Sequence, residues 1–443
     1  MKKILYLLMM TSYVSFSQII SSDLEESFSI FDIQDIYTFG DIPSYIGDIN
    51  YEVEAYKVLY YTPNENGELV IASGSIFIPI NPTCPVPILS WQHGTVVSDL
   101  GAPSENISNS AIGIIAASHG YIVVVSDYLG LGSGEGFHNY CHADTEASAV
   151  IDLIINANTF VNLLDVETND QLFLMGYSQG GHATMAAVKE LEANFINELT
   201  VTASAPMAGP YSMSEAQAEM LNTVYPNPGY FPYIIFAYQN VYNNLYSDIS
   251  EILKPGFEDL FDMYDGTYSM NDINESIWSI ASELYEIDSV SFTPLNMINE
   301  DYYYAYQNNE NHPFRLALEA NDLLDFIPQS PMRLIHCNGD NDVAYENSVM
   351  AFESFSPFMN EEIFLLDGGS FNHSECAKSS IISAKLFFDG LVNFCDETYL
   401  EELHSKQKIL KRFNILGQVI TQENKNISIR LYNDGSVDKI IVF

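Results

Sequence analysis

Hydrophobic and polar residues alternate along the chain from Tyr56 to Ile80, in two runs separated by Asn64-Glu65-Asn66-Gly67. Alternation with a period of two places every second side chain on the same face of a strand. An Asn-Gly pair between two such runs is a strong hairpin signal. The pattern therefore predicts an antiparallel β-hairpin.

Five further apolar runs are short and end in glycine or polar residues, and they begin at Val86, Tyr121, Gln171, Met332 and Glu362. Segments with helical periodicity lie between several of them, the clearest at 144–154, 179–195 and 376–392. Strands that alternate with helices predict a mostly parallel, doubly wound α/β sheet covered on both faces. Ligands bind such sheets beyond the carboxyl ends of the strands, so we expect the functional residues at that edge.

A long segment, about 212–326, interrupts the alternation and contains helical patterns instead of strands. One of its helices is expected to have Asn271 or Asp272 as its N-cap and an apolar face made of Ile273, Ile277, Ile280 and Leu284. Because the segment leaves and re-enters the alternating pattern, it predicts a helical cap over the sheet. A separate domain of unrelated purpose is the alternative.

The N-terminus has a basic start, a short apolar run at Ile4–Met10, and small residues up to Ser17. This pattern predicts a secretory signal peptide over residues 1–17, and hence a secreted protein. A membrane anchor is disfavoured because the run is too short to cross ~30 Å of hydrocarbon. No later segment reaches ~18 uninterrupted apolar residues, so we expect no transmembrane segment.

The C-terminal part alternates again, in the runs ILKRFNILGQVI, ISIRLY and DKIIVF, with a turn signal at Asn433-Asp434-Gly435. It predicts a small β-module at 408–443 after a polar linker at 396–407. Its LGQ, YNDGSV and KIIVF stretches resemble the C-terminal sorting domain of the bacterial type IX secretion system. The resemblance implies the secretion machinery as a partner, and an extracellular or outer-cell-surface location. An ordinary β-appendage is the alternative.

The amino-acid composition argues against some classes of binding partner. The 443 residues include 16 Lys and Arg against 59 Asp and Glu, a net charge of −43, which argues against nucleic acid and anionic membranes. The cysteines are odd in number, so at least one is unpaired: Cys84, Cys141, Cys337, Cys376 and Cys395. We expect a bridge between Cys376 and Cys395. No C-x-x-C spacing suggests zinc, and no motif requires a metal or an organic cofactor.

The sequence Gly176-Tyr-Ser178-Gln-Gly180 follows the apolar run QLFLM and precedes a helical pattern. A nucleophilic serine on a sharp strand-to-helix turn needs very small flanking residues, because its backbone is strained. The surroundings therefore predict Ser178 as a nucleophile, against the alternative of a glycine-lined turn without a catalytic role. A serine hydroxyl also needs a base, an acid that orients the base, and donors for the oxyanion.

The order Ser, acid, His selects the other two residues. His373 lies in the loop after the strand EIFLLD and is the expected base. For the acid, an H-G-x-x-D-x-x-V-P frame selects Asp340, with Asp342 as the alternative. Cys337 and Ala344 stand where that frame has Gly and Pro, so the acid is less well defined than the other two residues.

Two backbone N–H groups are expected to form the oxyanion hole. One belongs to Gln179, the residue after the nucleophile. The other belongs to Thr95, which follows His93-Gly94 at the end of the strand VPILSWQ.

The stretches SWQHGT, SDYLGLGSGEGFHNYCHADTEASAVIDLI and MGYSQGGHATMAA together resemble α/β-hydrolases of the secretory lipase, or lipase A-like, family. The likeness covers roughly Tyr51 to Asn393, within a catalytic domain expected at 18–395. It implies hydrolysis of small-molecule or lipid carboxylic esters through an acyl-enzyme, with the cap shaping the acyl site. The same triad leaves open a peptidase or an esterase that removes acetyl or feruloyl groups from polysaccharides. A surface binding protein with an inactive core is a further alternative.

Overall fold

The computed structural model describes residues 18–196, 198–357, 362–394, 409–414, 427–432 and 437–441. The expected signal peptide at 1–17, the linker at 396–407 and the turn at Asn433-Asp434-Gly435 lie outside these ranges.

The hairpin forms the antiparallel side of the central sheet. Strands β2 (Val53–Pro63) and β3 (Leu69–Pro79) pair antiparallel over their whole lengths. The Asn64 side chain closes the turn between them by accepting the backbone N–H groups of Asn66 and Glu68. Strand β1 (Ile19–Phe28) adds antiparallel to β2 at the edge of the sheet.

Parallel strands complete a nine-stranded sheet of order β1-β2-β3-β5-β4-β6-β7-β8-β9. They are β4 (Val86–Gln92), β5 (Ile122–Ser126), β6 (Thr168–Tyr177), β7 (Val201–Met207), β8 (Met332–His336) and β9 (Ile363–Asp367). All neighbouring pairs from β5 to β9 are parallel. The predicted fold class, a mostly parallel α/β-hydrolase sheet, is confirmed.

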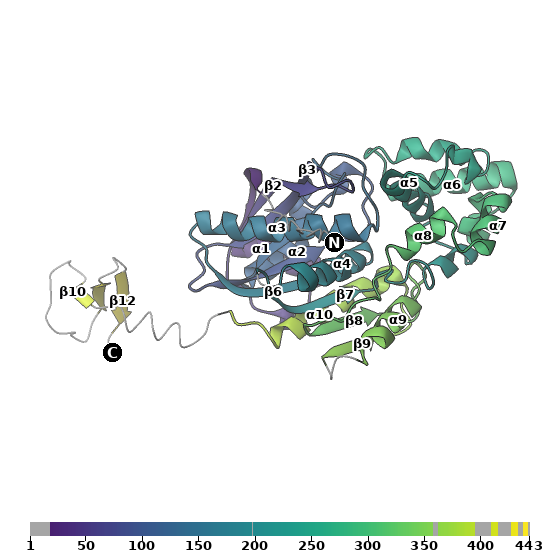
Figure 1. Ribbon diagram of the computed structural model, residues 1–443. Helices are drawn as coiled ribbons and strands as arrows, with labels where there is room; N and C mark the ends of the chain where they lie inside the picture. The colour runs from purple at the N-terminus through teal and green to yellow at the C-terminus, as the bar shows by residue number, and fades with distance from the viewer. Residues whose placement is uncertain are drawn as a thin grey trace, which may run out of the picture. The chain divides into compact units, whose positions relative to one another are not determined.

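Helices cover both faces of this sheet (Figure 1). They are α1 (Ile30–Phe39), α2 (Ala111–Ser118), α3 (Ala143–Leu163), α4 (Gln179–Asn194), α9 (Glu346–Phe355) and α10 (His373–Asp389). Leu172 and Leu174 of β6 belong to one core cluster with residues of α3 and α4. Phe173, between them, packs on Phe388 of α10. Alternate residues of one strand therefore fill the cores on opposite faces.

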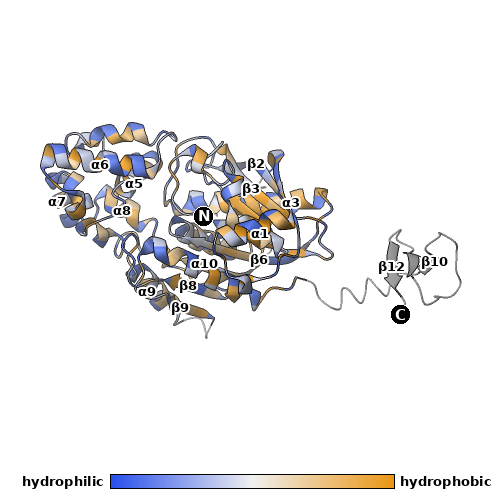
Figure 2. Cartoon of the chain, turned by 180° about the vertical axis from the view of Figure 1, so that it is seen from behind, coloured by the Kyte–Doolittle hydropathy of each residue, from blue (hydrophilic) through white to orange (hydrophobic). Residues whose placement is uncertain are grey.

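The segment between β7 and β8 forms helices α5 (Tyr230–Tyr242), α6 (Met270–Tyr285), α7 (Glu300–Asn308) and α8 (Pro313–Glu319). They gather at one end of the sheet in Figure 1 and contribute to a second hydrophobic cluster, which also includes Val97, Tyr140 and Cys141. Figure 2 shows hydrophobic and hydrophilic residues alternating along these helices, as expected for a layer with one buried side.

Two expectations for α6 were wrong in detail. Its N-cap is Ser269, whose side chain accepts the backbone N–H of Asp272, while the Asp272 carboxylate accepts the backbone N–H of Ser269. This reciprocal capping box starts the helix before the residues proposed as caps, Asn271 and Asp272. Leu284 is 61% exposed, so the buried face ends before the last turn of the helix.

The C-terminal strands β10 (Ile409–Asn414), β11 (Ile427–Tyr432) and β12 (Val437–Ile441) form a separate antiparallel sheet. They belong to a second compact unit, made of the described residues within 83–85 and 393–443, and the described residues within 1–82 and 86–392 form the first. Among the described residues, no helix combines the length and the apolar character that a membrane crossing requires.

The expected bridge between Cys376 and Cys395 is wrong, because Cys376 is bonded to Cys337, with a Cα–Cα distance of 6.0 Å. Cys337 follows β8 and Cys376 lies in the first turn of α10, so the fold brings together residues that are far apart in sequence. Cys84 is also disulfide-bonded, and Cys395 lies outside the described residues. Cys141 is a buried free thiol.

Replacing Cys337 and Cys376 together by Ser should lower the free energy of unfolding by about 3–4 kcal/mol, because the bridge closes a loop across 39 residues and restricts the unfolded chain. Urea unfolding at neutral pH measures this change. Cys141→Ser is the control, since it alters a buried sulfur without opening a bridge. An unchanged unfolding midpoint in the double variant would contradict the expectation.

Candidate active site

Ser178 stands between β6 and α4 in a strained backbone conformation, with φ 64° and ψ −124°. Such angles are uncommon for a residue with a side chain and persist only where the surroundings enforce them. Here the Ser178 N–H donates to the carbonyl oxygen of Met207 in β7, at 3.0 Å. The Ser178 carbonyl accepts the N–H groups of Gly181 and His182. The backbone is thus fixed on both sides while the side chain stays partly exposed.

Two glycines make this turn possible by close backbone approach. A Cβ atom on Gly180 would overlap the carbonyl oxygen of Gln92, and a Cβ on Gly176 would overlap the carbonyl oxygen of Gly180. Both overlaps involve backbone atoms, which cannot rotate away as a flexible side chain can. The small residues on either side of Ser178 therefore follow from the packing of β4, β6 and α4.

His373 and Asp340 lie in contact at the carboxyl edge of the sheet. His373 Nδ1 lies 2.5 Å from Asp340 Oδ2, and both side chains are almost fully buried. Because a carboxylate only accepts, Nδ1 carries the proton and Nε2 is left to accept one from another group. The Tyr177 hydroxyl donates to the carbonyl oxygen of His373 at 2.7 Å, which holds the first turn of α10 against β6.

The Asp340 carboxylate is held by several donors. Its Oδ1 accepts the backbone N–H groups of Asp342 and Val343, both at 2.9 Å. Its Oδ2 lies 3.2 Å from His336 Nε2. Burial disfavours the charged form, but the hydrogen bonds from His336 and His373 outweigh it and hold the pKa of Asp340 well below its usual range. Asp340 is therefore ionised at neutral pH.

Asp342, the alternative acid, makes different contacts. Its Oδ2 accepts the side-chain amide of Asn227, at 2.9 Å. Burial raises the pKa of Asp342, and no hydrogen bond joins its carboxylate to His373 among the described residues. The geometry therefore brings Asp340, and not Asp342, against the histidine.

Ser178 and His373 line one open, partly polar cavity, together with Gly94 and Thr95. No hydrogen bond joins the Ser178 hydroxyl to His373 in the described part of the chain. Such catalytic contacts are often long without substrate and tighten when it binds. A Cβ placed on Gly94 would lie 3.8 Å from the Ser178 Cβ, so the loop after β4 passes beside the nucleophile.

The two expected oxyanion donors come from two segments near Ser178. Gln179 is the first residue of α4, and the first amides of a helix have no acceptor within the helix. The helix dipole adds positive potential at the same place. Thr95 belongs to the loop after β4, where its hydroxyl lies 3.0 Å from the Tyr140 hydroxyl.

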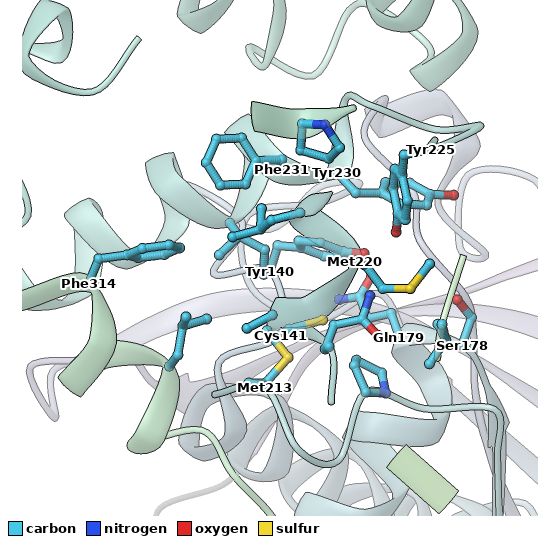
Figure 3. A pocket seen from close by; sticks show the side chains of 18 residues that line it. Tyr140, Cys141, Ser178, Gln179, Met213, Met220, Tyr225, Tyr230, Phe231 and Phe314 are labelled. Carbon is cyan, nitrogen blue, oxygen red and sulfur yellow. The ribbon is translucent and has the colours of Figure 1, made fainter. Parts of the chain in front are cut away.

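A second cavity extends from Ser178 and Gln179 under the cap, and its lining is mainly apolar. Figure 3 shows Ser178 at one end of the lining side chains and Phe314, from α8, at the other. Tyr225, Tyr230 and Phe231 lie above them in this view. Ser178 lines both cavities, the apolar one and the polar one, and so stands where they meet.

One buried group of side chains carries metal-ligand atoms. Donor atoms of Cys141, Glu146 and His182 lie within 4.8 Å of one another. Glu146 and His182 already bind each other, at 2.6 Å, and Glu146 also accepts the Gln179 side-chain amide at 2.8 Å. The carboxylate oxygens are thus engaged by donors, an arrangement that fits a hydrogen-bonded network better than a coordination shell.

Sequence reasoning missed His336 as a partner of the acid, and it missed the Cys337–Cys376 bridge beside both Asp340 and His373. His336 opens the H-G-x-x-D-like frame, so its signal was present. The bridge had no local signal, because it depends on how β8 and α10 meet.

Comparison with known proteins identifies the relatives of the chain. The model of a family described as secretory lipase matches residues 109–373. Lipase A of Moesziomyces aphidis is 25% identical over 189 residues, and this match covers 39% of the present chain and 39% of that lipase. The chain thus covers well under half the length of this relative.

Two solved structures extend the likeness. The rice cell wall degrading esterase LipA from Xanthomonas oryzae is 26% identical, with a TM-score of 0.76, over 85% of this chain and 99% of that one. Lipase A of Candida antarctica is 18% identical, with a TM-score of 0.59, over 85% of this chain and 83% of that one. The second likeness concerns the fold alone.

Replacing Asp340 by Asn should slow the reaction of Ser178 with a fluorophosphonate by about 10³–10⁴-fold, because the amide leaves His373 in the wrong tautomer to act as a base. Asp342→Asn is the matched control and should change the rate by less than about tenfold, since it removes a charge without touching His373. The labelling rate, followed by intact mass, measures both. The reverse ranking would assign the acid to Asp342.

Proposed function

The chain belongs to the secretory lipase family, and we propose from this and from the site geometry that it hydrolyses carboxylic esters through Ser178, His373 and Asp340. The observation that carries the proposal is the His373–Asp340 contact beside a strained, partly exposed serine. A buried carboxylate that holds Nδ1 leaves Nε2 as a base directed at the cavity that Ser178 lines.

The reaction proceeds in two halves. His373 Nε2 takes the hydroxyl proton as Ser178 Oγ attacks the ester carbonyl, and the tetrahedral intermediate then loses the alcohol, which receives the proton from His373. Water, deprotonated by the same nitrogen, attacks the acyl-enzyme. The second intermediate then releases the acid, and Ser178 Oγ takes the proton back from His373. Asp340 stays ionised and stabilises the imidazolium formed in each half.

The backbone N–H groups of Gln179 and Thr95 would bind the oxyanion of both intermediates. Gln179 provides the helix-terminal donor, and Thr95 lies in the loop that passes beside Ser178. Each such donor contributes about 3–4 kcal/mol to transition-state stabilisation.

The two cavities that meet at Ser178 suggest how an ester binds. The apolar cavity under the cap suits the acyl chain, because its walls are aromatic and aliphatic side chains. The wider, more polar cavity suits the alcohol, which leaves first. Phe314 and Leu318 line the acyl cavity from α8, and Phe314 lies far from Ser178 in Figure 3, so these residues would limit the length of the chain.

A second candidate is an esterase acting on polysaccharide side chains. The Xanthomonas oryzae relative is described as a rice cell wall degrading esterase. In the present chain, Asn106, Asn109 and Ser110 line the polar cavity beside Ser178, where hydroxyl groups of a sugar would find hydrogen-bond partners. A sugar would then take the place of the alcohol, and the acyl site would be unchanged.

We further propose that the chain is exported to the extracellular space or the outer cell surface. The signal pattern at 1–17, the sorting-like tail at 408–443 and the family's secretory description support this. Mass spectrometry of the secreted protein would reveal removal of residues 1–17, and a full-length intracellular product would contradict it.

The purified enzyme should hydrolyse a series of chromogenic esters. Its rate should be highest for short to medium acyl chains, because the cap residues Phe314 and Leu318 limit the length of the apolar cavity. Ser178→Ala should lower kcat by about 10⁵–10⁶-fold. Initial rates across the series, together with acetylated and feruloylated sugars, measure this and rank the two candidates. If wild type and Ser178→Ala both match buffer, the esterase proposal fails.

Phe314→Ala should shift the preferred acyl chain to longer esters, because it opens the far end of the cavity. Each added methylene that becomes buried is worth about 0.8 kcal/mol, or roughly fourfold in kcat/KM. Phe261→Ala is the control, since Phe261 belongs to the cap but is 50% exposed and does not line the cavity. An unchanged chain-length profile in Phe314→Ala would place the acyl chain elsewhere.

A further inference from the structure

The side chain of Gln179 points away from solvent, and its amide nitrogen is fully engaged. Its Nε2 lies 2.8 Å from Glu146 Oε1 and 2.8 Å from His138 Nε2. Gln179 is 1% exposed, so bulk solvent does not reach these protons. Gln179 provides the backbone N–H proposed as an oxyanion donor, and its side chain is held in place by these two hydrogen bonds.

His138 accepts from Gln179 because its other nitrogen is committed. His138 Nδ1 lies 2.8 Å from the carbonyl oxygen of Leu129, which only accepts, so Nδ1 carries the proton and Nε2 is bare. Burial lowers the pKa of His138 to about 3, which keeps the ring neutral. The two amide protons of Gln179 thus meet two acceptors, and the amide cannot flip without opposing its oxygen to both.

Glu146 is in turn fixed by His182. The second carboxylate oxygen, Oε2, lies 2.6 Å from His182 Nδ1, and both side chains are essentially unexposed. His182 Nε2 lies 3.2 Å from the carbonyl oxygen of Asn321, in the loop after α8. Both oxygens of Glu146 are therefore used, one for the histidine and one for Gln179.

Both nitrogens of His182 face acceptors, Glu146 Oε2 and the carbonyl oxygen of Asn321. A buried contact of this kind is weak evidence for stability, because desolvation of both groups opposes the attraction between them. A role in positioning accounts better for its place, one helical turn from Ser178.

We propose that Glu146 is a positioning residue for ester hydrolysis: held by His182, its carboxylate fixes the Gln179 side chain and thereby aims the Gln179 N–H at the oxyanion. The inference rests on the proposed function, since it deepens the role of Gln179. It adds a buried Glu146–His182 pair to the three residues of the candidate triad.

Glu146→Gln tests the proposal, because it keeps the shape and removes the charge. The new amide cannot accept from both Gln179 and His182 as the carboxylate does. We expect kcat to fall about 10–100-fold with KM within about twofold, since the oxyanion donor acts mainly in the transition state. The Ki of a trifluoromethyl ketone, which mimics the tetrahedral intermediate, should rise by the same factor. A change in KM alone, with kcat and Ki as in wild type, would overturn the proposal.

Gln179→Met provides the second arm, because it keeps the backbone N–H and removes only the side-chain anchor. It should lower kcat by a similar factor, and it tests the proposal even if Glu146→Gln folds poorly. In the double variant, Glu146→Gln should add less than about twofold to the effect of Gln179→Met, since both act through one contact. Wild-type turnover by Gln179→Met, or fully additive effects, would overturn the proposal.

Glu192→Gln is the matched control, on the helix that begins at Gln179. Glu192 is also a buried carboxylate, and it accepts N–H groups of Gln329 and Ser330 far along α4 from Ser178. Glu192→Gln should lower the unfolding temperature without changing the Ki of the trifluoromethyl ketone. An equal rise in Ki for Glu192→Gln would mean that the effect of Glu146→Gln reflects a general loss of stability.

Two further readouts separate this inference from its alternatives. Inactive wild-type enzyme would defeat the proposed function itself, whereas active wild type with an equally active Glu146→Gln defeats only the positioning role. Loss of wild-type activity in EDTA with recovery on adding Zn²⁺ would assign Glu146, His182 and Cys141 to a metal and overturn the proposal. Unchanged activity in EDTA supports the hydrogen-bonded role.

Discussion

The close approach of three backbones at the end of β6 is the constraint on which the site depends. Gly180 packs against the carbonyl of Gln92 in β4, and the Ser178 N–H is held by Met207 in β7. Because these strands are central in the sheet, the turn cannot relax without disrupting the core, and the positive φ at Ser178 is retained. The Ser178 side chain stays partly exposed, and the first two amides of α4 have no acceptor within the helix.

The second half of the site comes from the opposite side of β6 and is tied together covalently. Asp340 follows β8 and His373 begins α10, and the Cys337–Cys376 bridge joins these two segments three residues from each. Together with the Tyr177 hydrogen bond to the His373 carbonyl, the bridge limits how far the histidine can move from the acid. Positioning on this scale matters, because a displacement of ~1 Å at a reacting group can cost 10²-fold in rate.

The sequence predicted the secondary structure correctly where a local pattern of apolar and polar residues determines it. Alternation predicted the hairpin, and the short apolar runs predicted five of the parallel strands. Strand β7, VTASAPM, was missed because Thr, Ala and Ser give little hydrophobic signal, although the strand is buried between β6 and β8. The chosen partner of Cys376 was wrong because pairing depends on which chain ends meet in space, which no local pattern records. The roles of Ser178, Asp340 and His373 remain predictions, now with a geometry that makes each role testable.

The cap and the oxyanion site are linked through buried polar groups, a connection that the apolar pattern of the sequence does not suggest. Asn321, after α8, accepts from His182 through its carbonyl and accepts the Ala143 N–H at the start of α3 through its side chain. A displacement of Asn321 at the end of the cap would therefore move the hydrogen-bond partner of His182. His182 in turn contacts Glu146, and Glu146 accepts the side-chain amide of Gln179. Since buried polar groups must keep their partners, such a network favours discrete arrangements over gradual drift. In the proposed mechanism, binding of an acyl chain against α8 and alignment of the Gln179 N–H would thereby be coupled through one set of hydrogen bonds.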